Sequence, residues 1–239
     1  MCLRVPSRTE WQSDAREANT KVREQRMSLL PIFLKLEGRP CLVVGAGEIA
    51  LSKIESLLEA GARVRVVAPE ARQEVQSLAS SGRVAWLARG YETADLEAAF
   101  LVIAATDQPA VNHKVFEDAT QRGMLCNAVD DPPFCDFYFG SVVRRGDLQV
   151  AISTAGESPA LAQRLRREID ARLSEDLGPW LASLGNLRRD VLVAHPAGEE
   201  RKLLLHELAH RPVCELEQCP SRRLALGPLQ AGPELKVPA

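Results

Sequence analysis

The sequence predicts an α/β protein: a doubly wound parallel sheet, then a smaller region of strands and a helix, then a helical region. Within residues 40–61 a short apolar strand pattern leads through a glycine turn into a helical pattern. Strand and helix patterns then alternate up to about residue 129. Two strand patterns and three helical patterns occupy residues 139–210. Strands that alternate with helices are typical of a right-handed doubly wound sheet.

Each element can be placed along the chain in order. Strands are predicted at residues 41–44, 63–68, 84–87, 100–105 and 124–129, with helices starting near Ile49 and at 70–80 and 110–121. Further on, strands at 139–143 and 148–153 precede helices at 160–173, 180–194 and 198–210. Ser158 is expected to cap the first of these last helices, with Pro159 as its first residue.

Bulk composition excludes several classes of protein. The chain has 239 residues, of which 46% are hydrophobic and 26% charged, as is ordinary for a globular protein. A net charge of −2 offers no basic field to nucleic acid, and no apolar run approaches the roughly 20 residues that span a bilayer. The six cysteines show no framework spacing, so we expect a reducing, cytoplasmic setting and neither nucleic-acid nor membrane partners.

The first turn has the residue types of a dinucleotide-binding fingerprint. Gly45 permits a tight turn, and Gly47 lets the backbone approach a pyrophosphate because it has no Cβ. Ala50 stands where the third glycine usually lies. Free N–H groups at the start of the helix then face the phosphate charge. This pattern predicts a Rossmann-type NAD-binding domain, and a plain strand-turn-helix is the alternative.

Ligands of such sheets bind beyond the carboxyl ends of the strands. The residues expected along that edge are Gly45–Gly47, Pro69, Thr106, Asp107 and Asp130. Glu70 is placed either to bind the ribose hydroxyls or to open the following helix. Because no arginine other than Arg72 occupies this corner, NAD is favoured over NADP.

Two groups of charged residues have both a chemical and a structural interpretation. Asp130 follows the fifth strand together with Asp131, and a carboxylate there can act as a general base or start an acidic turn before Pro132. Residue type alone favours the turn. The arginines of the second region either bind a polyanionic small molecule or form a solvated helix face. They are Arg144, Arg145, Arg164, Arg166, Arg167 and Arg172.

The segment His206–His210 matches the zinc-peptidase pattern on a predicted helix. Cys214 or Cys219 would offer a further ligand. Too few residues follow His210 to build a protease cleft, so no metal site is predicted, and a zinc peptidase that uses His206 and His210 is the less favoured alternative.

Five segments together resemble a known family. They are Leu30–Phe33, Cys41–Gly47, Ala104–Asp107, Cys126–Asp130 and Ser158–Ala162. In this order and spacing they resemble precorrin-2 dehydrogenase/sirohydrochlorin ferrochelatase, which is the amino-terminal module of siroheme synthases and also a stand-alone enzyme. The resemblance runs from about Met27 to about His210.

The resemblance implies a function and a site. It implies oxidation of precorrin-2 to sirohydrochlorin with NAD and, in many members, insertion of ferrous iron to give siroheme. The catalytic aspartate falls on Asp130, against the turn interpretation. The nucleotide contacts fall on Gly47, Glu48, Ile49, Pro69, Glu70 and Thr106, with Gly45 and Asp107 completing the expected cofactor site. Arg144, Arg145 and Arg166 are expected to bind the carboxylates of the tetrapyrrole.

The resemblance also implies a homodimer and a division of the chain between about Met27 and His210, and the lack of periodicity outside these residues predicts the rest. We expect a loosely structured extension at 1–26, the NAD-binding domain at 27–138, a dimerisation region at 139–175, a helical region at 176–211 and an irregular tail at 212–239. A non-catalytic NAD-sensing module is the competing function. Such a module would bind NAD without turning over precorrin-2.

Overall fold

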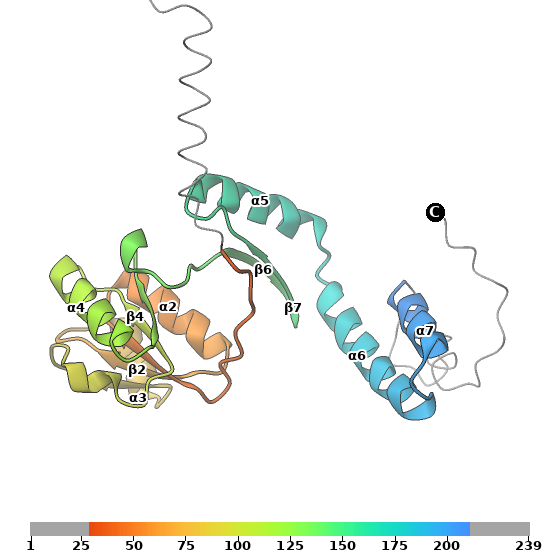
Figure 1. Cartoon of the computed structure of the whole chain (residues 1–239), viewed down its shortest axis with the longest axis horizontal. Helices are drawn as coiled ribbons and strands as arrows, with labels where there is room; N and C mark the ends of the chain where they lie inside the picture. The colour runs from red at the N-terminus through yellow and green to blue at the C-terminus, as the bar shows by residue number, and fades with distance from the viewer. Residues whose placement is uncertain (1–28, 211–239) are drawn as a thin grey trace, which may run out of the picture. The chain divides into compact units, whose positions relative to one another are not determined.

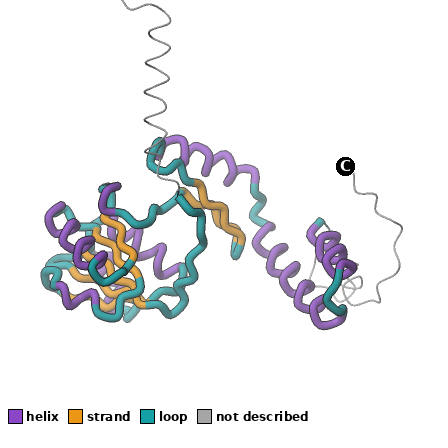
Figure 2. The backbone as a smooth tube through the Cα atoms, viewed as in Figure 1, coloured by secondary structure: helices purple, strands orange, loops and turns teal. Residues whose placement is uncertain are grey.

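The computed structural model describes residues 29–210, so the extension expected at 1–26 and the tail expected at 212–239 lie outside the described residues. The chain forms two compact units, the first ending at Phe139 and the second beginning at Gly140 (Figure 1). Each unit has its own secondary structure and its own packing (Figure 2).

A five-stranded parallel sheet of order β3-β2-β1-β4-β5 forms the first unit. The strands are β1 (Pro40–Val44), β2 (Arg63–Val67), β3 (Val84–Leu87), β4 (Leu101–Ala104) and β5 (Leu125–Ala128). The helices are α2 (Glu48–Glu59), α3 (Gln73–Ser80) and α4 (Pro109–Thr120), with short 3₁₀ turns η1 (Thr93–Leu96) and η2 (Pro132–Phe134). This architecture confirms the predicted fold class.

Alternating side chains give the sheet two buried faces. Val43 and Ile103 pack on one face with Ile54 of α2. Leu42 and Val102 on the other face pack with α4 and η1. Because both faces are covered by helices, the strands are apolar along most of their length, as the sequence indicated.

Two predicted helix starts are wrong, each for a local reason. The helix expected at 70–80 begins only at Gln73, because the Arg72 N–H donates to the Ala46 carbonyl (3.2 Å) and holds this segment as a loop. The helix expected at 180–194 begins earlier, at Leu177, and includes Pro179 in its first turn. Proline is tolerated there because first-turn N–H groups have no partner within the helix.

The second unit starts with an antiparallel hairpin. Strands β6 (Ser141–Arg145) and β7 (Leu148–Ile152) pair across a turn in which Gly146 has φ +56°. Helix α5 (Pro159–Arg172) packs against this hairpin, and Ser158 Oγ accepts the Leu161 N–H (3.2 Å), which confirms the predicted cap.

Two further helices complete the described chain. Helix α6 (Leu177–Ala194) and helix α7 (Glu199–Ala209) pack through Leu187, Val191, Leu204 and Leu208. Between residues 29 and 210, we find no helix with the length and apolar character that crossing a bilayer requires.

An ion pair between the partly exposed Arg89 and the buried Asp95 closes the η1 turn and makes its stability depend on pH. Arg89 donates two hydrogen bonds to Asp95 (2.6 and 2.8 Å), and the Glu92 N–H donates a third (2.9 Å). The arginine bond, followed by the backbone bond, holds the pKa of Asp95 below its ordinary value despite burial. This carboxylate therefore stabilises the fold above the pKa it has in the unfolded chain, and that stability is lost as the pH falls through the folded pKa.

We expect Asp95→Asn to lower the free energy of unfolding by about 2 kcal/mol at pH 7 and by clearly less at pH 3. Urea unfolding at the two pH values measures both effects. The exposed Asp147→Asn in the hairpin turn is the control and should change neither. An equal loss at both pH values would contradict the assignment.

Candidate active site

Gly45 lies where the chain leaves β1 between two neighbouring strands. Its N–H donates to the Val67 carbonyl (2.9 Å), and its φ is +110°. A Cβ at this position would lie 2.3 Å from the Ala105 carbonyl oxygen. Only glycine fits both the backbone conformation and the close approach.

Gly47, directly before α2, is not confined by neighbouring atoms as Gly45 is. A Cβ here would meet no atom within 4 Å, so the glycine is not required by packing within the described chain. No side chain caps the helix, which begins at Glu48 with Ile49 and Ala50 in its first turn. First-turn N–H groups have no partner in their own helix. The open backbone and uncapped helix start therefore fit the pyrophosphate of a dinucleotide.

The corner next to this turn carries more acid than base. Pro69 and Glu70 are exposed, and since α3 begins at Gln73, the alternative that Glu70 opens the helix is wrong. The Arg72 guanidinium lies 3.1 Å from Glu74 and 3.9 Å from Glu48. With its charge already met by two carboxylates, Arg72 is poorly placed to bind a 2′-phosphate.

A cleft of about 310 Å³ lies at the carboxyl edge of the sheet. Four of the predicted site residues line it, namely Ile49, Thr106, Asp107 and Asp130. Its other lining residues are Ala105, Pro109, Asn112, Val129 and Asp131. The remaining predicted cofactor residues, Gly45, Gly47, Glu48, Pro69 and Glu70, do not line this cleft. The cleft thus joins the first turn of α2 to the segment after β5.

Asn112 holds the turn that carries Thr106. Its side-chain oxygen accepts from the Thr106 hydroxyl (2.7 Å) and from the Thr106 N–H (3.1 Å), and its amide donates to the Thr106 carbonyl (3.1 Å). Asn112 is buried on the face of α4 that also buries Val115 and Ala119. Sequence reasoning missed it, although a polar residue at a core position of a helix is a detectable signal.

Asp130 adopts a left-handed backbone conformation with φ +62°. It follows Val129, whose N–H donates to the Ala104 carbonyl (2.9 Å), and it precedes a turn closed by the Asp131 N–H and the Ala128 carbonyl (3.2 Å). Aspartate tolerates this conformation better than most residues, at a cost of about 1 kcal/mol. A strained residue that lines a cleft is typical of functional sites.

A histidine–carboxylate pair borders the same cleft. His113 Nε2 lies 2.6 Å from Asp131 Oδ2, and the imidazole stacks on Phe134 with 3.8 Å between the ring centroids. Asp131 is therefore occupied by a partner, whereas Asp130 accepts no hydrogen bond from residues 29–210 that would fix its carboxylate. No pattern in the sequence predicted that His113 and Asp131 would be in contact.

Lys53 is a positively charged residue near the cleft that the sequence analysis did not select. It lies half-buried on α2, and its Nζ is 4.1 Å from the centroid of the Phe139 ring. Burial lowers the pKa of Lys53, and the negative charge of Asp130 opposes that shift. Lys53 follows Ile49 by one helical turn, which is the spacing that places both on one face of the helix.

The three arginines predicted to bind substrate lie in the second unit. Arg145 is mostly buried and donates to Asp170 Oδ1 (2.9 Å), the Asp170 carbonyl (2.9 Å) and the Leu173 carbonyl (3.0 and 3.1 Å). Its guanidinium therefore ties the hairpin to α5. Arg144 is exposed and Arg166 is half-buried. Their role in substrate binding stays a prediction.

His206 and His210 are exposed at the end of α7, while Leu204 and Leu208 of the same helix are buried. In the stretch from residue 29 to 210, no group of three or more His, Cys, Asp and Glu side chains is arranged to hold a metal ion. Cys214 and Cys219, the further ligands considered above, lie outside the described residues.

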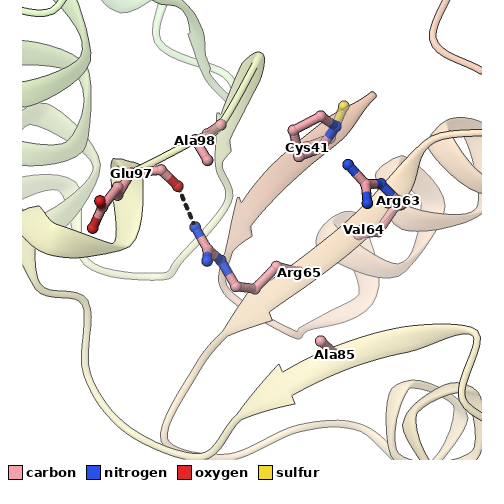
Figure 3. A pocket seen from close by; sticks show the side chains of 9 residues that line it. Cys41, Arg63, Val64, Arg65, Ala85, Glu97 and Ala98 are labelled. Carbon is pink, nitrogen blue, oxygen red and sulfur yellow. Dashed lines mark hydrogen bonds between the residues drawn. The ribbon is translucent and has the colours of Figure 1, made fainter. Parts of the chain in front are cut away.

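A second cavity, of about 240 Å³, lies at the amino ends of β1 and β2 (Figure 3). Arg65 points across it and donates to the Glu97 carbonyl (3.1 Å) and to the Asp95 carbonyl. These bonds hold the turn that passes through Ala98, whose φ is +60°. The cavity is thus at the edge of the sheet opposite the candidate active site, and its arginine has a structural use.

Two sequence families match consecutive parts of the chain. Residues 32–141 match the family described as "Putative NAD(P)-binding", and residues 145–172 match the one described as "Sirohaem biosynthesis protein central". Together with the fold, these matches assign the chain to the class of α/β proteins with an NAD(P)-binding type of domain followed by a sirohaem biosynthesis segment.

Known proteins make the relationship more specific. Siroheme synthase 1 of Cronobacter sakazakii is 48% identical over 162 residues, which are 68% of this chain and 34% of that protein. The siroheme synthase of Ectopseudomonas mendocina is 40% identical over 190 residues, 79% of this chain and 40% of that protein. The structure of SirC, precorrin-2 dehydrogenase, matches with a TM-score of 0.66 and 26% identity, over 81% of this chain and 92% of SirC.

These matches confirm the resemblance to the precorrin-2 dehydrogenase/sirohydrochlorin ferrochelatase family. The chain spans only 34–40% of the length of these two siroheme synthases.

Proposed function

We propose that this chain catalyses the NAD-dependent oxidation of precorrin-2 to sirohydrochlorin in siroheme biosynthesis. One observation carries the proposal: Ile49, from the uncapped first turn of α2, and Asp130, from the end of β5, line the same cleft. A dinucleotide held at the helix start and a substrate beside Asp130 would therefore meet. The similarity to SirC, precorrin-2 dehydrogenase, supports this choice of substrate.

The chemistry divides between the cofactor and the chain. Dehydrogenation removes a hydride and a proton, and a nicotinamide, when bound, accepts the hydride. Asp130 accepts the proton, as a carboxylate positioned in a cleft can do. Thr106, held by Asn112, and Asp107 line the same cleft as Ile49. Arg144 and Arg166 are the proposed contacts for the tetrapyrrole carboxylates. Arg145, predicted with them, already donates to Asp170 and Leu173, and its proposed part is to hold the hairpin that carries Arg144.

We also propose that the same cleft inserts ferrous iron into sirohydrochlorin. Metal insertion releases two pyrrole protons per macrocycle, and Asp130 is proposed to accept them one after the other and to pass each to solvent. In this reaction ferrous iron is a substrate, because it becomes part of the product siroheme. Insertion in the presence of Asp130 but not of its asparagine variant would support a shared site.

The proposed cofactor is NAD rather than NADP. Because Arg72 already pairs with Glu48 and Glu74, a 2′-phosphate would bring negative charge next to these acids and the exposed Glu70. We expect NAD to bind more tightly than NADP, because the 2′-phosphate would add negative charge to a corner that already holds more acid than base. Titration of both nucleotides by calorimetry measures the ratio. Equal affinities would contradict this assignment.

Purified protein mixed with precorrin-2 and NAD tests the proposed function. The absorbance of NADH should rise together with that of sirohydrochlorin. Later addition of ferrous iron should give siroheme. NAD binding without turnover would instead favour an NAD-sensing module. Tightly bound stoichiometric zinc, lost with activity in His206→Ala, would favour the peptidase.

We further propose a homodimer and a cytoplasmic location. Resemblance to the family supports the dimer, and the free thiols of Cys41 and Cys126 are consistent with a reducing compartment. Burial raises the pKa of Cys41 to about 11 and that of Cys126 to about 12, so both thiols stay protonated at neutral pH. Light scattering of the purified chain measures the oligomeric state.

A further inference from the structure

Lys53 is a half-buried cation on the face of α2 that borders the cleft. Ile49, four residues earlier, lines the cleft together with Asp130, and residues at this spacing share one helix face. The Lys53 ammonium also lies close enough to Asp130 to feel its charge. The lining of the cleft includes Asp130 but not Lys53, so the ammonium belongs to the helix beside the cleft and not to its wall.

The ammonium of Lys53 is partly open to solvent and is bound by no acceptor of the described residues. An ammonium has three donors, yet Lys53 makes no hydrogen bond or ion pair with any other residue of the described range 29–210. Its contact is the ring face of Phe139, at 4.1 Å from the centroid, and Phe139 is held in turn by an edge contact to Phe137. A ring face attracts a cation but accepts no strong hydrogen bond. A bound carboxylate would replace water with a charged acceptor.

We propose that Lys53 binds a peripheral carboxylate of the tetrapyrrole and so orients the macrocycle against Asp130. This inference rests on the function proposed above and names a contact within it. Precorrin-2 and sirohydrochlorin both carry carboxylates around the ring, so substrate and product share the contact. Lys53 acts on binding and orientation, and proton transfer stays with Asp130. It is the one lysine of the first unit, among residues 29–139, that is not exposed.

Steady-state kinetics of Lys53→Met, Lys53→Arg and Lys35→Met test the proposal. Lys35 is exposed, so its variant removes the same charge away from the cleft. We expect Lys53→Met to raise KM for precorrin-2 about tenfold with little change in kcat, as the loss of one charge-assisted bond predicts. Lys53→Arg should restore KM to within about threefold because it keeps the charge and the donors. Lys35→Met should match the unmodified chain, and NAD affinity should be the same in all four proteins.

Titration with sirohydrochlorin gives a second readout that does not depend on turnover. Lys53→Met should bind it about tenfold more weakly, and raised salt should reduce the difference. Unchanged KM and unchanged sirohydrochlorin affinity in Lys53→Met would overturn the Lys53 inference alone. A fall in kcat with a shifted pH profile and normal affinity would also overturn it, since Lys53 would then act through Asp130. An unmodified chain that neither oxidises precorrin-2 nor binds sirohydrochlorin would overturn the proposed function itself.

Discussion

Asp130→Asn is expected to lower kcat for precorrin-2 oxidation by about 10²–10⁴-fold, which is the range for removing a positioned general base. The amide has the shape of the carboxylate but cannot take the proton. Asparagine also tolerates the left-handed conformation that Asp130 adopts at φ +62°. Folding and NAD affinity should therefore be preserved, and the loss should fall on the chemical step.

Asp131→Asn is the matched comparison. Asp131 lines the same cleft, but its carboxylate is already bonded to His113 at 2.6 Å, so we expect less than about a tenfold loss of kcat. Stopped-flow formation of NADH, with thermal melts as the folding control, separates the two variants. If Asp130→Asn kept kcat within about threefold of the unmodified chain, Asp130 would not be the base.

Two substitutions in the glycine turn are expected to fail in different ways. In Gly45→Ala the new methyl would lie 2.3 Å from the Ala105 carbonyl oxygen, at a residue whose φ is +110°. Overpacking and backbone strain together should cost about 3 kcal/mol or more. We therefore expect a melting temperature lower by about 6–12 °C, or no folded protein at all.

Gly47→Ala should instead fold normally and bind NAD poorly. Its φ of −81° suits alanine, and the methyl would meet no atom of the described chain within 4 Å. That open space is where a pyrophosphate would approach the start of α2, so we expect NAD affinity to fall about tenfold or more. Thermal melts and NAD titration of both variants measure the contrast. A stable Gly45→Ala, or a Gly47→Ala that binds NAD normally, would contradict the corresponding role.

Local signals predicted most of the fold. The apolar strands around Val43 and Ile103, the turn at Gly45 and the Ser158 cap all depend on residues close together in the chain, and each was confirmed. The two helix starts that were wrong, at Gln73 and Leu177, sit where a loop contact or a tolerated proline changes the boundary. Boundaries are decided by single hydrogen bonds, such as that from Arg72 to Ala46, which no periodicity encodes.

Contacts between distant segments decided what the sequence left open. Helix α3 begins at Gln73, so Glu70 does not open it. Asn112, the His113–Asp131 pair and Lys53 entered the site because α2, α4 and the segment after β5 meet at one edge of the sheet. Their roles depend on side chains that are far apart in the chain, which a one-dimensional pattern does not report.

The sequence by itself determined the α/β architecture, the dinucleotide-type turn and the position of Asp130 at the end of a strand. It did so because apolar periodicity and glycine placement act over a few residues, and the sheet geometry then follows from the order of the elements. Only the tertiary structure decided which charged side chains already have a partner of opposite charge, such as Arg72 and Asp131. It also decided which are left to bind a ligand, such as Lys53. Pairing depends on distance and burial in three dimensions, and these arise only when the chain has folded.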